Sequence, residues 1–297
     1  MSSFSSLASR VGRLGLGCVT FGREIDRAAS YAVLDHAHQN GIVHFDTASA
    51  YANGESERIL GSWIKDRALS AGTLVLSTKI RPPYRRETIE NEIGESLTRL
   101  GLETVDLLYL HQWSDDLLDP AVLEVLETAL TTGRVAAIGG SNFDAAQLGR
   151  VCEIQRANGF SRLQAVQNNH NFAVSHVDAS LRALCRQEGI CIFGYSPLGA
   201  GFLTGKHRQG VEAGSRFEVI PGHRNVYFTP HAWERLDRME SVAKAAGQSL
   251  PTVALAWALQ RPSVDCTLIG GRSPKHIDQA LVALALGTPS WLEDLGP

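Results

Sequence analysis

The sequence lacks the features that identify several broad classes of protein. It has no run of about 18 apolar residues, which excludes a membrane-spanning helix. Its Lys and Arg residues are not clustered and its formal net charge is -3, which argues against a nucleic-acid partner. The first residues show no basic region followed by an apolar stretch, as a secretory signal would. We therefore expect a soluble, cytoplasmic protein.

Cysteine and histidine also lack the spacing of a disulfide framework or a metal site. The cysteines are scattered, odd in number and without a C-x-x-C pair, which fits free thiols in a reducing compartment. The histidines include no H-x3-H pair, so we expect no metal. The composition that remains is 44% hydrophobic and 20% charged over 297 residues, which is enough for a large core.

Short apolar segments rich in β-branched residues recur along the chain, and helical patterns alternate with them. The apolar segments lie at 14–18, 41–46, 73–79, 105–111, 135–141, 163–167, 190–195 and 266–270. The helical patterns lie near 27–40, 55–71, 86–100, 120–132, 144–158, 176–188, 231–260 and 274–286. Eight alternating units in roughly 250 residues predict a (β/α)8 TIM barrel, which we expect to occupy residues 1–297 as a single domain.

The competing architecture is an open, doubly wound sheet that binds a dinucleotide. That fold needs G-x-G-x-x-G after its first strand, whereas "GLGCVTFG" has glycines at 15, 17 and 22. We therefore favour the barrel. The longest stretch with little helical pattern covers 198–230, and a loop of that length in a compact domain is usually functional or mobile.

Ionisable side chains stand at the ends of three consecutive predicted strands. Asp46 ends the second, Lys79 the third and His111 the fourth, and Tyr51 follows five residues after Asp46. Each has an ordinary explanation when taken alone: a turn or capping acid, a solvated lysine, a core histidine and a loop aromatic. Because the carboxyl ends of barrel strands share one mouth, the four together predict a catalytic site.

These four residues suit acid–base chemistry at a carbonyl group. A free tyrosine has a pKa of about 10, and we expect the Lys79 ammonium to lower that of Tyr51. Asp46 would keep Lys79 charged, and His111 would hold the substrate oxygen. Tyr51 would then donate a proton to an oxygen that becomes negative as a hydride reaches the carbon.

Six motifs carry a resemblance to a known family. They are "FDTASAYANGESERILG", "STKI", "DLLYLHQW", "GRVAAIGGSNF", "YSPLGAGFLTGK" and "LIGGRSPKHIDQAL". Together they resemble the aldo-keto reductases over about residues 11 to 285. The resemblance implies a (β/α)8 barrel that reduces an aldehyde or ketone reversibly to an alcohol, prefers NADPH, and uses Tyr51, Asp46, Lys79 and His111. It leaves the oligomeric state open, as monomer or homo-oligomer.

The resemblance also implies a cofactor site on the later strands. Amide and hydroxyl groups would hold the nicotinamide carboxamide, a tyrosine would cover the ring, and small residues would let backbone N–H groups approach the pyrophosphate. The implied residues are Ser141, Asn142, Gln167, Tyr195, Ser196, Pro197, Leu198, Gly199 and Gly201. Lys206 is either a further phosphate partner or a solvated charge.

The segment after the eighth strand would hold the other end of the cofactor. A helix that begins near residue 273 offers free N–H groups, and Arg272 can grip a phosphate as a fork. Arg272 and His276 together favour binding of the 2′-phosphate of NADP. NADH, which lacks this phosphate, is therefore the less favoured cofactor. Ile269, Gly271 and Gln279 complete the implied set. Relatives often carry Glu-Asn where this chain has Gln279-Ala280, so we expect a modest affinity for NADP(H).

Aromatic residues are expected to border the substrate. We assign Phe21 and Trp113 to the pocket wall, whereas Tyr227 and Phe228 either contribute to it or pack on the barrel. Such walls suit an apolar or sugar-like carbonyl compound. Relatives with narrow selectivity have a longer C-terminal tail that closes the pocket, so the resemblance leads us to expect an open site with broad tolerance here.

Two other functions fit part of this pattern. An NADP(H)-binding regulatory barrel of the potassium-channel beta type would keep the same four residues with little turnover. A Schiff-base enzyme would use Lys79 as a nucleophile, but Asp46 argues against it, because a carboxylate keeps the lysine protonated. The direction of the reaction is left open.

Overall fold

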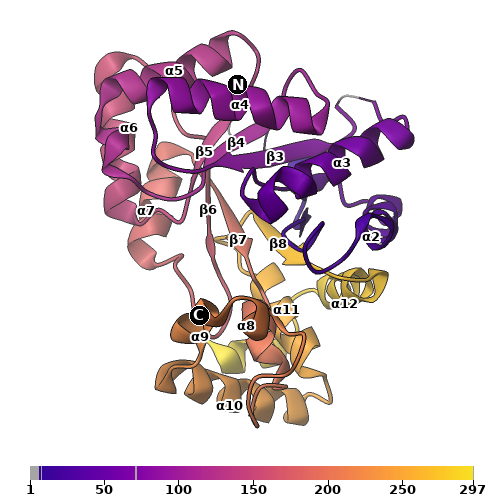
Figure 1. Ribbon diagram of the computed structural model, residues 1–297. Helices are drawn as coiled ribbons and strands as arrows, with labels where there is room; N and C mark the ends of the chain where they lie inside the picture. The colour runs from indigo at the N-terminus through magenta and orange to yellow at the C-terminus, as the bar shows by residue number, and fades with distance from the viewer. Residues whose placement is uncertain (1–6, 8, 71, 297) are drawn as a thin grey trace.

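The computed structural model describes residues 7, 9–70 and 72–296 and shows a closed barrel of parallel strands (Figure 1). The strands pair in chain order, and β1 pairs with β8 to close the barrel. Their bounds are β1 (Leu14–Gly17), β2 (His44–Asp46), β3 (Val75–Ile80), β4 (Leu107–Leu110), β5 (Ile138–Ser141), β6 (Ala165–Asn169), β7 (Cys191–Tyr195) and β8 (Cys266–Gly270). Each strand overlaps the segment predicted for it, so the (β/α)8 barrel is confirmed.

Helices follow the strands and cover the outside of the barrel. After β1 to β6 come α2 (Arg27–Gln39), α3 (Glu55–Asp66), α4 (Arg86–Leu100), α5 (Pro120–Thr131), α6 (Ala145–Asn158) and α7 (Ala179–Glu188). The later helices are α10 (Pro230–Ala245), α11 (Leu250–Leu259) and α12 (Pro274–Ala285), with the 3-10 turns η2 (Asp115–Leu118) and η5 (Ser290–Leu295) elsewhere. Within the described ranges, no helix has the length and apolar character needed to cross a lipid bilayer.

The prediction of one helix over 231–260 is wrong, because the chain breaks between α10 and α11. Gly247 adopts a left-handed φ of 62°, a conformation that ends helices. Ser249 then caps α11 by accepting a hydrogen bond from the backbone N–H of Thr252, and Pro251 lies in the first turn. These stop and start signals are present in the sequence, but the apolar pattern runs through them.

Alternation along each strand separates the barrel interior from the face that meets the helices. In β2, Phe45 packs outward against Trp63 of α3, with ring centroids 5.3 Å apart. His44 instead lies inside, where its ring centroid is 5.3 Å from that of Phe193 in β7. Asp46, two residues after His44, therefore also points into the barrel.

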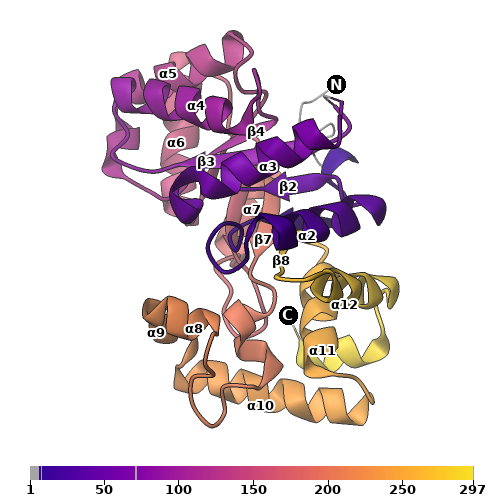
Figure 2. The same cartoon turned by 45° about the vertical axis from the view of Figure 1, so that its right-hand side comes forward.

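The segment 198–230 holds several short helices rather than one irregular loop. They are η3 (Gly199–Thr204), α8 (Arg216–Val219), η4 (Pro221–His223) and α9 (Arg224–Tyr227). Aromatic rings hold them together: the ring centroids of Phe202 and Trp233 are 4.5 Å apart, and the Tyr227 hydroxyl donates to Asn169 at 3.1 Å. Figures 1 and 2 show α8, α9 and α10 gathered at one end of the molecule, away from α4 and α5.

Candidate active site

The four residues predicted to be catalytic come from the mouth of the barrel, where three of them meet through Lys79. The Lys79 ammonium forms an ion pair with Oδ2 of Asp46, and both side chains are buried. It also donates to the carbonyl oxygen of Thr47 at 2.8 Å and to the Tyr51 hydroxyl at 3.3 Å. The three donors of the ammonium therefore have three acceptors, which holds the side chain in one orientation.

The local backbone explains how Tyr51 reaches Lys79. Tyr51 begins the 3-10 turn η1 (Tyr51–Gly54), which leads directly into α3. Ala52 and Asn53 have positive φ values of 48° and 53°, and Gly54 has φ 82°. A Cβ atom at Gly54 would lie 2.6 Å from Cδ of Arg99, so a larger residue would be strained at this φ and would force Arg99 to move. This compact turn places the tyrosine over the barrel mouth.

The pKa of Tyr51 is raised above its ordinary value, so the prediction of a lowered pKa is wrong in its net direction. Burial of the phenol raises this pKa, and the nearby charge of Lys79 lowers it by less. For Lys79, burial alone lowers the pKa, but the charge of Asp46 and the hydrogen bonds to Asp46 and Tyr51 outweigh it and the pKa is raised. The site therefore holds a protonated phenol beside a protonated amine.

His111 follows β4 and faces Tyr51 edge to face, with ring centroids 5.9 Å apart. Burial and the charge of Lys79 lower its pKa to about 4, so the imidazole is neutral at physiological pH. Its Nδ1 atom is buried and has no hydrogen-bond partner among the described residues. A buried nitrogen without a hydrogen-bond partner is suited to a polar ligand.

Residues at the ends of β5, β6 and β7 lie on the other side of this mouth. Asn142, at a positive φ of 61°, donates to the His111 carbonyl oxygen at 3.0 Å and accepts from the Tyr195 hydroxyl at 2.6 Å. Ser141 donates to the carbonyl oxygen of Gln167 at 3.1 Å. The Gln167 side chain reaches across the barrel and donates to Oδ1 of Asp46 at 3.0 Å. That contact to Asp46 was not part of the sequence prediction.

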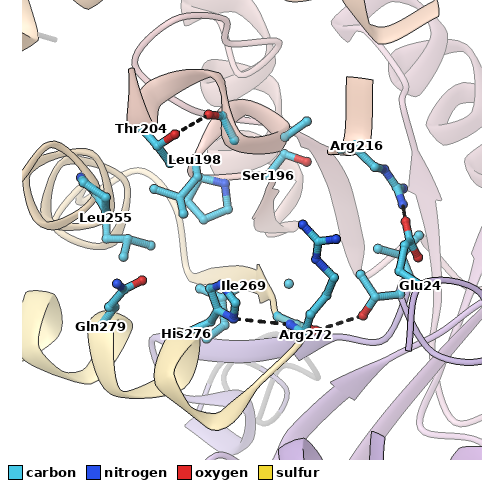
Figure 3. A pocket seen from close by; sticks show the side chains of 18 of the residues that line it. Glu24, Ser196, Leu198, Thr204, Arg216, Leu255, Ile269, Arg272, His276 and Gln279 are labelled. Atoms are coloured by element: carbon cyan, nitrogen blue, oxygen red, sulfur yellow. Dashed lines mark hydrogen bonds and ion pairs between the residues drawn. The ribbon is translucent and has the colours of Figure 1, made fainter. Parts of the chain in front are cut away.

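A cavity of about 470 Å³ lies between the segment after β7 and the segment after β8 (Figure 3). Most residues assigned to the cofactor from the sequence line it: Ser196, Pro197, Leu198, Gly201, Lys206, Ile269, Gly271, Arg272, His276 and Gln279. Gly199 is not among its lining residues; it is buried, and a Cβ atom there would lie 3.0 Å from the Tyr227 ring. Ala280 is also buried and faces the core.

Sequence reasoning missed several residues that line this cavity. Glu24, from the loop after β1, forms an ion pair with Arg216 of α8, and both line the cavity. Thr20, His223 and Leu255 line it as well. Glu24 and Arg216 are 192 positions apart, so no local pattern could have paired them.

The residues around the cavity fit a phosphorylated cofactor. No side-chain hydrogen bond caps the N-terminus of α12, which leaves backbone N–H groups for an anion. Arg272 stands in the cavity in Figure 3, where its guanidinium donates to the carbonyl oxygen of Gly214 at 2.9 Å. Nδ1 of His223 is buried without a partner within the described part of the chain. Lys206, by contrast, is paired with Glu212 at 3.0 Å.

The predicted substrate residues differ in their placement. Phe21 is fully buried in the core, and its assignment to the substrate pocket stays a prediction. Trp113 is half-buried after β4 and packs against Phe143, with ring centroids 5.5 Å apart. Tyr227 and Phe228 belong to the aromatic cluster of the 198–230 segment and pack on Phe202.

Comparison with known proteins agrees with this geometry. The model of the Aldo/keto reductase family matches residues 13–290. An uncharacterized oxidoreductase of Bacillus subtilis, YrpG, is 26% identical over 93% of this chain and 88% of its own length. Norsolorinic acid reductase B of Dothistroma septosporum is 27% identical over 93% of this chain and 74% of its own.

A mammalian protein shows a similar level of likeness. Aflatoxin B1 aldehyde reductase member 2 of Rattus norvegicus is 27% identical, covering 92% of this chain and 80% of its own length. The family match covers nearly the whole chain, including every strand of the barrel and its polar mouth. The chain therefore belongs to the aldo/keto reductase family, whose members are oxidoreductases that use a nicotinamide cofactor.

Proposed function

We propose that this protein reduces an aldehyde or ketone reversibly to an alcohol with NADPH, and that Tyr51 is the proton donor. The observation that carries the proposal is the buried contact of one ammonium, Lys79, with both Asp46 and the Tyr51 hydroxyl. The names of two relatives, an aldehyde reductase and a norsolorinic acid reductase, support carbonyl reduction as the reaction class.

The chain's own residues supply the proton and position the carbonyl. Tyr51, whose pKa is raised, remains a phenol at neutral pH and can give its proton to the substrate oxygen. Lys79 stabilises the phenolate that this transfer leaves, because it is positively charged and 3.3 Å from the phenol oxygen. His111 is neutral and adjacent, so it can hydrogen-bond the same oxygen without competing as an acid.

The cofactor proposal rests on the cavity between β7 and β8. A bound nicotinamide cofactor supplies the hydride. Ser196, Gly201 and the N-terminus of α12 would hold its phosphates, and Arg272 with His276 would hold the 2′-phosphate that distinguishes NADPH from NADH. Ser141, Asn142, Gln167 and Tyr195 stand at neighbouring strand ends, where they would hold the nicotinamide.

Two alternatives are distinguished by the same site. A Schiff-base mechanism needs a neutral Lys79, but the charge of Asp46 and the hydrogen bonds to Asp46 and Tyr51 raise its pKa. A regulatory barrel would keep these contacts and bind NADPH without sustained turnover. Steady-state turnover is therefore the deciding observation.

The test follows NADPH absorbance with 4-nitrobenzaldehyde, methylglyoxal and a sugar aldehyde for wild type and Tyr51→Phe. We expect repeated turnover by wild type and a loss of about 100-fold or more in kcat for the variant, with NADPH binding retained. Tyr31→Phe is the matched control, because its hydroxyl bonds Asp66 on the surface. Equal rates for wild type and Tyr51→Phe would refute the role of Tyr51. NADPH binding with no turnover of any compound would favour the regulatory barrel.

A further inference from the structure

A row of buried polar groups continues inward from Asp46 into the barrel. The Ser77 hydroxyl of β3 donates to Oδ1 of Asp46 at 2.6 Å. Nε2 of His44 in β2 lies 3.1 Å from the Ser77 oxygen, and Nδ1 of His44 lies 3.8 Å from the thiol of Cys266 in β8. All four side chains are buried, and no catalytic or cofactor-binding role was predicted from the sequence for the last three.

The negative charge of Asp46 determines which group donates and which accepts in each hydrogen bond of this row. Asp46, paired with the Lys79 ammonium, is a carboxylate and only accepts, so the Ser77 hydrogen points to it. The Ser77 oxygen is then the acceptor for His44, whose Nε2 must carry the proton. Burial lowers the pKa of His44 to about 4, so the ring is neutral and its Nδ1 is free to accept from Cys266. Burial raises the pKa of Cys266, which keeps it a thiol donor.

The strand register and one glycine bring these groups together. Asp46 and Ser77 are direct partners across β2 and β3, and His44 and Lys79 each lie two residues away on the same interior face. Gly15 of β1 leaves the space for the imidazole, because a Cβ atom there would lie 2.9 Å from Nδ1 of His44. Room for a histidine inside the barrel is thus made by the absence of a side chain on the neighbouring strand.

Two neutral donors, Ser77 and Gln167, converge on Oδ1 of Asp46 and leave Oδ2 to Lys79. This division matters because Lys79 must keep one donor directed at the Tyr51 hydroxyl. If Oδ1 loses a donor, the carboxylate carries more unbalanced charge and attracts the ammonium more strongly. Both effects make the potential at Tyr51 more negative, since Asp46 raises the pKa of Tyr51 and Lys79 lowers it.

We propose that Ser77, oriented by His44, is a positioning residue: it holds Asp46 in place so that the Lys79 ammonium keeps its hydrogen bond to the Tyr51 hydroxyl. The inference rests on the proposed acid role of Tyr51 and deepens it. Ser77 contacts neither substrate nor cofactor in this scheme; it acts through Asp46 and Lys79 alone.

Other titratable or charged groups face this network from the surrounding elements: Cys18, Arg81, Asp106, Tyr109, His111 and Tyr195. Burial raises the pKa of Cys18, Tyr109 and Tyr195 and lowers that of His111, so these four are neutral near pH 7. Asp106 is paired with Arg10 at 2.7 Å. Near neutral pH, a substitution at Ser77 can therefore change the electrostatic potential at Tyr51 only by moving the charged groups of Asp46 and Lys79.

The test compares Ser77→Ala with Thr78→Ala. Thr78 is the next residue of β3, and its buried hydroxyl donates to the buried carboxylate of Glu57 at 2.5 Å. Both variants remove a buried hydroxyl that donates to a carboxylate, but only the hydroxyl of Ser77 donates to Asp46. For Ser77→Ala we expect kcat to fall roughly ten-fold with KM nearly unchanged. The alkaline limb of its kcat–pH profile should move upward by about half a pH unit.

Thr78→Ala should match wild type in both quantities, even where it lowers thermal stability. Ser77→Thr keeps the hydroxyl and should restore the wild-type pH profile, which separates positioning from packing. A readout independent of turnover is the NMR signal of the Lys79 ammonium, assigned by its absence in Lys79→Met; it should shift in Ser77→Ala and stay in place in Thr78→Ala. The proposal is overturned if Ser77→Ala keeps both the wild-type profile and the ammonium signal, or if Thr78→Ala changes them equally. If wild type shows no turnover, the proposed function fails, and the ammonium signal still decides whether Ser77 positions Lys79.

Discussion

Replacing Lys79 by methionine tests both the chemistry and the electrostatics of the buried site. The ammonium is enclosed at the barrel mouth and pairs with Asp46, which is also buried. Methionine has a similar length and no charge, so the substitution removes the partner of a buried carboxylate without opening a large cavity. Breaking such a pair costs about 3–5 kcal/mol, because one charge is left without compensation.

The structure places the expected loss at the lower end of that range. Asp46 keeps two hydrogen bonds to Oδ1, from Ser77 and Gln167, which continue to stabilise the carboxylate. We therefore expect a loss of about 3 kcal/mol near pH 7. For 297 residues, the unfolding entropy is roughly 0.6 kcal/mol/K, so the melting temperature should fall by roughly 5 °C. Carbonyl reduction should fall by at least about 100-fold, since the phenolate of Tyr51 loses its nearest cation.

The loss should also depend on pH. In Lys79→Met, the carboxylate of Asp46 is buried without a counter-charge near neutral pH, and acid lowers this cost because it neutralises carboxylates. The stability deficit is then largest at neutral pH and shrinks as the pH falls. Thermal unfolding of wild type and variant at about pH 7.5 and about pH 5 measures this difference.

A second variant supplies the control for that experiment. Asp46→Asn combined with Lys79→Met removes both charges, and it should recover much of the lost melting temperature and show no added pH dependence. Two results would refute the reasoning. One is a double variant whose melting temperature is no higher than that of Lys79→Met. The other is a stability loss of Lys79→Met that is equal at both pH values.

Two further predictions concern the cofactor and the buried histidines. Arg272→Ala should raise the Kd for NADPH by about ten-fold or more and change that for NADH by less than about three-fold, because a charge-assisted phosphate contact is lost; fluorescence titration measures both, and equal losses for the two cofactors would contradict the assignment. Burial lowers the pKa of His44, His111 and His170 to about 4, below the unfolded value of about 6.5. The unfolded chain therefore binds more protons between these values, and wild-type stability should be complete above about pH 6.5 and fall progressively toward about pH 4. Thermal unfolding across this range measures the fall, His170→Gln should reduce it, and a melting temperature that is constant across the range would contradict it.

Much of the fold and the polar mouth of the barrel could be predicted from the sequence, because both follow from local patterns. Apolar segments that alternate with helical patterns determine a parallel barrel, and the carboxyl ends of its strands must share one face. Asp46, Lys79 and His111 could thus be grouped without coordinates. The break between α10 and α11 was equally local, with Gly247 and Ser249 as its signals, but the continuous apolar pattern concealed it.

Other properties of the site depended on the tertiary structure, since they arise from residues far apart in the chain or from burial. Gln167 reaches Asp46 across 121 positions, and Glu24 reaches Arg216 across 192. The ammonium beside Tyr51 was foreseen, but the net direction of its pKa shift was not, because desolvation depends on everything packed around the phenol. The same holds for the complete burial of Phe21 and for the space that Gly15 leaves for His44. The sequence alone determined which polar groups end the strands. Only the closed barrel decided which atoms these groups contact and which of them stay charged when they are buried.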